Sequence, residues 1–238
     1  MTTPKTLRAI LLDIEGTTTP ISFVHEVLFP YARLHLSTYL RQHSDSPEVL
    51  ADLTCLRQEH VADITAGQQP PPLVEQYVYW LIDRDRKSPG LKSLQGKIWQ
   101  QGYEDGSLLA PVFEDVRPAI ERWNDTGISV NIFSSGSVLA QKLLFAHTEA
   151  GDLTRFISKY FDTGVGKKTD ADSYRQISSA LSVAPNQIHF ISDVTTELDA
   201  AEDAGMKTSL CVRPGNRVQE SGSRHKTIRT FDETFDES

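Results

Sequence analysis

The sequence is poor in cysteine and has no long apolar run. Only two of its 238 residues are cysteine, Cys55 and Cys211, and they lie far apart. We therefore expect no disulfide framework and, by default, a cytoplasmic location. No window approaches the roughly 20 apolar residues that cross a bilayer. The first apolar stretch is too short for a signal peptide and ends in acids, so we expect neither a secreted nor a membrane protein.

The chain also lacks a surplus of positive charge. It has 24 Lys and Arg against 32 Asp and Glu, which gives a net charge of −8. General nucleic-acid binding needs a basic surface, so we expect no nucleic-acid partner. An anionic substrate is still compatible with this charge, because a local site can be cationic or carry a metal.

What the chain does contain, near its start, is an apolar run that ends on an acid. In RAILLDIEGTTTP the run Ala9 to Leu12 leads into Asp13, and Glu15 follows two residues later. Ligands of α/β folds bind at the carboxyl ends of strands. One acid at such an exit can attack or bind metal while the other moves protons. A lone acid there is often only a helix cap, but the second acid, the glycine and the threonines favour a catalytic role.

Residues 22 to about 103 have a helical pattern throughout. Pro30 predicts a kink or break in the first segment, and Pro70 to Pro72 separate the second segment from the third. The predicted helices cover residues 23–40, 46–64, 73–87 and 91–103.

From about residue 111 helices and strands alternate. The predicted strands are 128–135, 159–163, 188–193 and 207–214, with 227–231 as a possible edge strand, and the predicted helices are 116–127, 137–147, 170–181 and 196–205. Such alternation implies an α/β fold with a mainly parallel sheet covered on both faces. We predict a core of residues 1–18 and 112–238, interrupted by a helical domain of residues 19–111, and we expect the acidic tail, 231–238, to be frayed.

Polar side chains follow the later strands as well. They are Ser134 and Ser135 before a predicted helix, Lys167 and Lys168 before another, and Asp193 with Glu197 four residues on. Hydroxyls and free N–H groups at a helix start can bind an anion. The carboxyl ends of parallel strands share one edge of a sheet, so we expect these groups to lie close to Asp13.

These groups suit the hydrolysis of a phosphate ester. A carboxylate is repelled by a phosphate dianion unless a cation intervenes. Mg²⁺ prefers oxygen ligands, which Asp13 and Asp193 would supply. Lys168 and the Ser134/Ser135 pair would neutralise and orient the phosphate oxygens. Asp13 would then attack phosphorus.

The motifs resemble those of the haloacid dehalogenase superfamily of aspartate-nucleophile phosphatases. The matching strings are LLDIEGT, NIFSS, a lysine before a helix, and ISDVTTE, and the helical insertion after the first strand is where that superfamily has its cap domain. One departure is Glu15, where the superfamily commonly has Asp. With DIEGTTTPISFV, FSSGSVLAQKLLF, FDTGVGKKTDADSY and CVRPGN, nearly the whole chain is similar to the enolase-phosphatases of methionine salvage, the acireductone synthases.

The resemblance implies a set of roles, a cofactor and a substrate. It assigns one Mg²⁺ per subunit to Asp13, Glu15 and Asp193, catalysis to Asp13, Glu15 and Lys168, and substrate binding to Ser134, Ser135 and Lys168. The implied substrate is a small phosphorylated diketone, 2,3-diketo-5-methylthiopentyl-1-phosphate, which is enolised and then dephosphorylated to acireductone. The family also implies a monomer.

Several alternatives stay open at this point. Glu15 and Lys168 are both candidates for the base that removes the carbon-bound proton. We interpret Glu197 as a first-turn acid favoured by the helix dipole rather than as a metal ligand. The other functions to consider are a phosphatase acting on another small metabolite, and a non-catalytic module that binds phosphate or metal.

Overall fold

The computed structural model describes residues 7–84, 86, 88–216 and 224–235. The chain divides into two compact units. Met1–Val24 and Leu109–Ser238 form the first, here called the core unit, and His25–Leu108 form the second, here called the helical unit. The helical unit falls within the predicted insertion, 19–111, so the chain leaves the core unit after its first strand and returns to it once.

One six-stranded sheet organises the core unit. Its strands are β1 (Ala9–Leu12), β2 (Ser129–Phe133), β3 (Ile157–Phe161), β4 (Ile188–Ser192), β5 (Lys207–Cys211) and β6 (Lys226–Ile228). Their order is β3-β2-β1-β4-β5-β6, and every neighbouring pair is parallel. The predicted parallel α/β fold is therefore confirmed, including the edge strand β6. β1 lies inside the sheet and all four of its residues are 0% exposed, which explains its unbroken apolar run.

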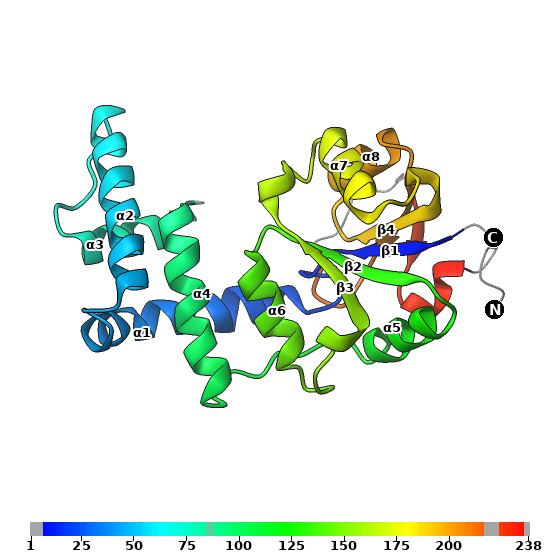
Figure 1. The fold of residues 1–238 in the computed structure, drawn as a ribbon, viewed down its shortest axis with the longest axis horizontal. Coiled ribbons are helices and arrows are strands. Elements are labelled where there is room, and N and C mark those ends of the chain that lie inside the picture. Colours follow the sequence, from blue (N-terminus) through cyan, green and yellow to red (C-terminus); the bar gives the residue numbers. More distant parts are fainter. Residues whose placement is uncertain (1–6, 85, 87, 217–223, 236–238) are drawn as a thin grey trace. The chain divides into compact units, whose positions relative to one another are not determined.

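Helices cover both faces of this sheet. They are α5 (Val116–Asp125), α6 (Val138–Ala146), α7 (Ala171–Leu181) and α8 (Thr195–Asp203). α7 and α8 lie on one face and α5 on the other (Figure 1). On the α7 side Tyr174 packs between Phe133 of β2 and Phe190 of β4, with ring centroids 5.5 and 5.1 Å apart. This packing holds β2, β4 and α7 together close to the carboxyl ends of the strands, where the predicted site residues lie.

Four helices build the helical unit. They are α1 (Phe29–Gln42), α2 (Pro47–Thr65), α3 (Val74–Ile82) and α4 (Pro89–Glu104). A π-helical turn, η1 (Phe23–Leu28), runs directly into α1, whose first turn contains Pro30. The helix changes its winding just before the proline but is not broken there. The prediction of a helix as far as residue 87 was too long: α3 ends at Ile82, and residues 85 and 87 lie outside the described part of the chain.

The helical unit has a core of its own. Leu36, Leu56 and Tyr77 are each at most 1% exposed. α2 and α4 approach closely where α4 begins, since a Cβ on Gly90 would lie 2.8 Å from Leu56 Cγ. Apolar contacts of this kind make the four helices one packed body.

The end of the chain differs from expectation. A short 3₁₀ helix, η5 (Phe231–Phe235), follows β6, and Phe231 is only 1% exposed. Its ring packs against Trp123 of α5 with the centroids 5.4 Å apart. The prediction of a frayed tail was wrong for residues 231–235, because an aromatic anchor outweighs the acidic composition; residues 236–238 lie outside the described range.

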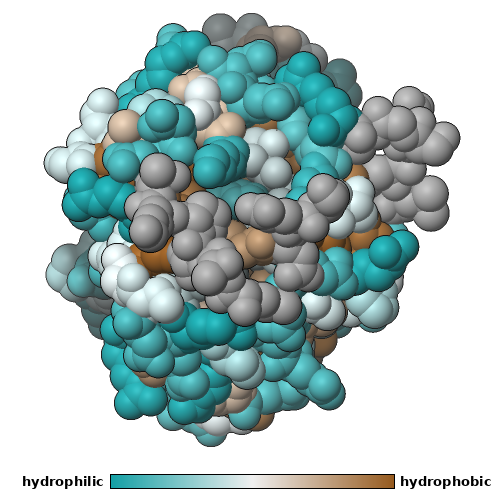
Figure 2. Space-filling view, turned by 90° about the vertical axis from the view of Figure 1, so that its right-hand side faces the viewer, coloured by the Kyte–Doolittle hydropathy of each residue, from teal (hydrophilic) through white to brown (hydrophobic). Residues whose placement is uncertain are grey.

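The face drawn in Figure 2 is mostly hydrophilic, and its hydrophobic spots are small and separate. Single exposed apolar residues of this kind are ordinary on protein surfaces. None of the helices in the described part of the chain combines the length and apolarity that a membrane span needs.

Candidate active site

Asp13 stands at the exit of the buried strand β1. Its backbone N–H donates to the carbonyl of Ile191 at 3.0 Å, which extends the pairing of β1 with β4 by one residue. The residue is 5% exposed, and its Oδ1 accepts a hydrogen bond from the N–H of Ile14 at 2.8 Å. A single carboxylate is thereby fixed at the edge of the sheet where ligands of this fold class bind.

A tight turn follows this acid. The N–H groups of Thr17, Thr18 and Thr19 all point to the carbonyl of Ile14, at 3.2, 2.9 and 3.0 Å. Gly16 has φ +70°, and a Cβ on it would lie 2.4 Å from Oδ2 of Asp193. Only glycine combines this backbone conformation with such a close approach.

Gly16 therefore brings Asp193, at the exit of β4, against the turn that carries Glu15. Glu15 itself is half-buried in that turn. The three predicted metal ligands, Asp13, Glu15 and Asp193, consequently occupy two adjacent strand exits.

Lys168 reaches this edge from the loop between β3 and α7. Its Nζ lies 2.7 Å from Oδ1 of Asp13 and 2.6 Å from Oε2 of Glu197, and its side chain is 9% exposed. The hydroxyl of Tyr174 donates to the carbonyl of Lys168 at 2.7 Å and fixes the loop. Lys167 is exposed, so the structure places Lys168, and not its neighbour, beside the nucleophile candidate.

Two further residues complete this arrangement: Ser192, which the sequence analysis did not single out, and Glu197, which it placed at this edge without a role in the site. The hydroxyl of Ser192 lies 3.1 Å from Oδ2 of Asp13 and 3.1 Å from Oε2 of Glu197, and it accepts a hydrogen bond from the N–H of Val194. Glu197 does lie in the first turn of α8, but its side chain is only 13% exposed and ion-paired. The interpretation of Glu197 as merely a dipole-favoured acid was therefore incomplete. Its spacing of four residues from Asp193 was the signal in the sequence.

The site holds more negative than positive charge. Burial, followed by the negative charge of Asp13, raises the pKa of Asp193 to about 7 and that of Glu197 to about 7. Burial alone would lower the pKa of Lys168, but its two carboxylate partners, Asp13 and Glu197, outweigh it and the pKa is raised. A buried, oxygen-rich and net negative group of this kind suits a hard divalent cation such as Mg²⁺.

The predicted serines follow β2, the neighbour of β1 on its other side. Ser134 is 4% exposed, and its hydroxyl accepts a hydrogen bond from the N–H of Gly136 at 3.2 Å. Ser137 caps α6 by accepting from the N–H of Ala140 at 3.3 Å. Lys168 Nζ lies 5.8 Å from the ring centre of Phe133, which directly precedes Ser134, so the serine loop and the lysine share one edge.

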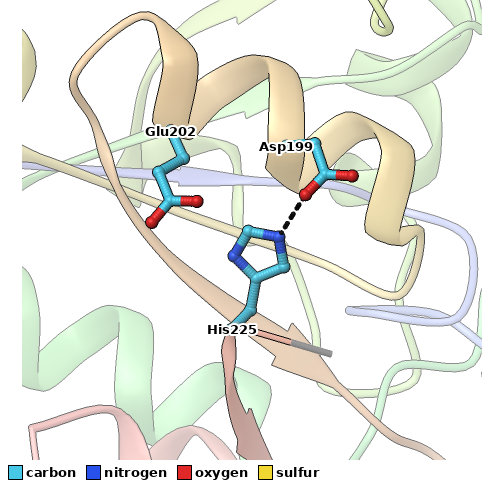
Figure 3. A group of neighbouring side chains, drawn as sticks. All are labelled: Asp199, Glu202 and His225. Carbon is cyan, nitrogen blue, oxygen red and sulfur yellow. Dashed lines mark hydrogen bonds and ion pairs between the residues drawn. The ribbon is translucent and has the colours of Figure 1, made fainter. Parts of the chain in front are cut away.

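A second cluster of titratable groups lies apart from these residues. Asp199 and Glu202 of α8 face His225, and Asp199 Oδ1 is 3.0 Å from His225 Nε2 (Figure 3). The guanidinium of Arg224 lies 3.1 Å from Asp199 and 2.6 Å from Glu202. Since Arg224 already forms an ion pair with each of these carboxylates, we assign the cluster to fixing the start of β6 on α8 rather than to a metal centre.

Comparison with known proteins identifies the family of the chain. A profile of haloacid dehalogenase-like hydrolases matches residues 7–205. An enolase-phosphatase E1 from Synechococcus elongatus is 50% identical, covering 98% of this chain and 100% of the relative. One from Sorangium cellulosum is 45% identical over 95% of this chain and 96% of the relative.

Solved structures share the fold of this chain. The UTR4 protein of Saccharomyces cerevisiae is 37% identical with a TM-score of 0.79, covering 95% of this chain and 99% of that one. CbbY from Rhodobacter sphaeroides, at 18% identity and a TM-score of 0.62 over 95% and 96% of the two chains, shares the fold. The chain belongs to the haloacid dehalogenase-like hydrolases and, within them, to the enolase-phosphatase E1 family.

Proposed function

We propose that this protein is a Mg²⁺-dependent enolase-phosphatase that converts 2,3-diketo-5-methylthiopentyl-1-phosphate into acireductone and phosphate. One observation carries the proposal: Asp13, at the exit of the central strand, is held between Lys168 Nζ at 2.7 Å and the Ser192 hydroxyl at 3.1 Å. The names of the relatives, enolase-phosphatase E1, support the choice of substrate.

We assign the magnesium site to Asp13, Glu15 and Asp193. The donor set is oxygen, and the excess negative charge around it is what a divalent cation neutralises. Bound there, Mg²⁺ would reduce the repulsion between a carboxylate and a phosphate dianion, and it would polarise a diketone oxygen.

The phosphoryl transfer uses two acids in turn. Asp13 attacks phosphorus and forms an aspartyl-phosphate, while Glu15 gives a proton to the leaving oxygen. Glu15 then takes a proton from the water that hydrolyses the intermediate. Lys168 and the Ser134/Ser135 loop bind the remaining phosphate oxygens and fix the phosphorus in line with Asp13.

The enolisation step needs a base for a carbon-bound proton. Lys168 is held as an ammonium ion between Asp13 and Glu197, so its role is charge neutralisation. Glu15 lies half-buried in the turn that follows Asp13. We therefore assign the proton abstraction to Glu15 and the orientation of the phosphate to Lys168.

The test is to supply the diketo-phosphate and p-nitrophenyl phosphate with Mg²⁺ and to follow phosphate release and enol absorbance together. We expect both signals from the diketo-phosphate, no phosphate from Asp13→Asn, and no enol from Glu15→Gln. Phosphate from p-nitrophenyl phosphate alone would instead favour a phosphatase for another small metabolite. If neither ester released phosphate, the result would contradict the proposal.

A further inference from the structure

The loop after β5 is tied to the turn after β1. The Nδ2 of Asn216 donates to the carbonyl of Gly16 at 2.9 Å and to the carbonyl of Cys211 at 3.3 Å. In the sheet β4 lies between β1 and β5. The amide of Asn216 therefore bridges the exits of two strands across the exit of β4, which carries Asp193.

The orientation of this amide is determined by its partners. Two carbonyl oxygens need a donor, so the amide nitrogen Nδ2 faces them. A Cβ on Gly16 would lie 2.9 Å from Asn216 Oδ1 and 2.4 Å from Asp193 Oδ2. Asn216 thus packs directly against the glycine that also touches Asp193.

Arg213 holds the next carbonyl of the same turn. Its Nε donates to the carbonyl of Thr17 at 3.1 Å. The rest of the guanidinium is fixed by a bidentate ion pair with Asp115, 2.9 Å for each bond, and by the rings of Phe113 and Phe231 at 4.5 and 4.8 Å. The side chain is 3% exposed, so this donor has little freedom to move.

We propose that Asn216 and Arg213 are positioning residues that lock the peptide planes of Gly16 and Thr17 and thereby aim Glu15 and Asp13 at the metal and the phosphate. This inference rests on the proposed function. Neither residue touches the reacting atoms. They act on consecutive carbonyls behind the catalytic turn, where a small displacement of the backbone would move both acids.

The chain offers a matched control for Asn216. Asn124 also donates from Nδ2 to two backbone carbonyls, those of Ile120 at 2.9 Å and Phe156 at 3.0 Å. It belongs to the same unit but lies in the last turn of α5, where it bonds other backbone groups. Asn216→Ala and Asn124→Ala therefore each remove two hydrogen bonds from a side-chain amide to backbone carbonyls. Only the bonds of Asn216 reach the turn that carries Glu15.

The experiment measures Mg²⁺ affinity by calorimetry, kcat and KM for phosphate release, and Tm, for both variants. We expect Asn216→Ala to weaken Mg²⁺ binding and lower kcat by about ten- to a hundredfold, as loss of a supporting contact around a metal site does. We expect Asn124→Ala to lower Tm comparably but to keep Mg²⁺ affinity and kcat within about twofold, as for a purely structural bond. Asn216→Ser, whose hydroxyl is too short to span both carbonyls, serves as the second variant if the alanine variant does not fold.

Equal Mg²⁺ affinity and kcat in the Asn216 and Asn124 variants would overturn the inference. Failure of the proposed function is distinguishable, because the wild type would then release no phosphate from the diketo-phosphate. In that case the Mg²⁺ titration still decides whether Asn216 positions the turn.

Discussion

At the scale of single residues, the candidate site is organised by one ammonium group that lies between two carboxylates. Lys168 contacts Asp13 and Glu197 at 2.7 and 2.6 Å, while Ser192 contacts the same two acids through its hydroxyl. Asp13 is thus held from both of its oxygens before any substrate arrives. Such preorganisation lowers the cost of reaching the transition state.

Lys168→Met should abolish most of the phosphatase activity. The change removes the ammonium group that pairs with Asp13, and with it a positive charge that would bind the phosphate. We therefore expect phosphate release to fall by about a hundredfold or more. Lys167→Met is the matched control, because Lys167 is exposed on the same loop, and it should retain nearly full activity. Similar rates for the two variants would show that Lys168 does not act on the phosphate.

The stabilisation of the fold by Mg²⁺ should increase with pH. The pKa values of Asp193 and Glu197 are raised to about 7, so the folded, metal-free protein keeps protons that the unfolded chain has already lost. The contribution of these protons to the free energy of unfolding is present in full below about pH 4 and is lost as the pH rises towards 7. Mg²⁺ needs the ionised carboxylates, so the rise in Tm on adding it should be small at about pH 5.5 and large at about pH 8. An equal rise at both pH values, or an undiminished rise in Asp193→Asn, would contradict the assignment.

At the scale of secondary-structure elements, the site is built from strand exits on one edge of a parallel sheet. β2, β1 and β4 are neighbours in the sheet, and the residues that directly follow them are Ser134, Asp13 and Asp193. The turn after β1 is the most constrained of these exits, because Gly16 must adopt a positive φ and admit Asp193 at the same time.

Gly16→Ala should separate these two demands when compared with Gly127→Ala. Gly127 has φ +78° after α5, and a Cβ there would have nothing within 4 Å. Both variants should lose about 1 kcal/mol of stability from the backbone conformation. Only Gly16→Ala should also lose Mg²⁺ affinity and phosphate release, since its methyl group displaces Asp193. Retained Mg²⁺ binding in Gly16→Ala would contradict the geometry of this turn.

The sequence predicted the strand exits because their signals are local. An apolar run that ends on Asp13, or a strand that ends on Asp193, can be recognised within ten residues. The role of Glu197 depends on Lys168, which arrives from a distant loop, and the contacts of Asn216 join residues 200 positions apart. Contacts of that kind depend on strand order, which local patterns do not specify.

At the scale of the whole molecule, the chain consists of two bodies, each with its own core. The helical unit, His25–Leu108, leaves the core unit and returns to it once. Its four helices bury Leu36, Leu56 and Tyr77 among themselves. An insertion with a complete apolar core is expected to fold as a unit.

The helical unit should therefore fold when produced alone. We expect residues 25–108 to give a helical circular dichroism spectrum and a cooperative thermal transition. Leu56→Ala should destabilise this fragment by about 3 kcal/mol, because Leu56 is 0% exposed and lies against Gly90. The exposed Leu34 provides the control, and Leu34→Ala should have little effect. A non-cooperative transition in the fragment would show that its core is insufficient by itself.

The central claim, that Asp13 attacks phosphorus, can be tested most directly by trapping the intermediate in Glu15→Gln. p-Nitrophenyl phosphate has a good leaving group that needs no acid, so this variant should still transfer the phosphoryl group but hydrolyse the intermediate slowly. The account predicts a burst of p-nitrophenol and, after acid quenching and peptide mapping, one phosphoryl group on Asp13. Steady phosphate release with no phosphoryl group on any peptide, or a phosphoryl group on another residue, would contradict it.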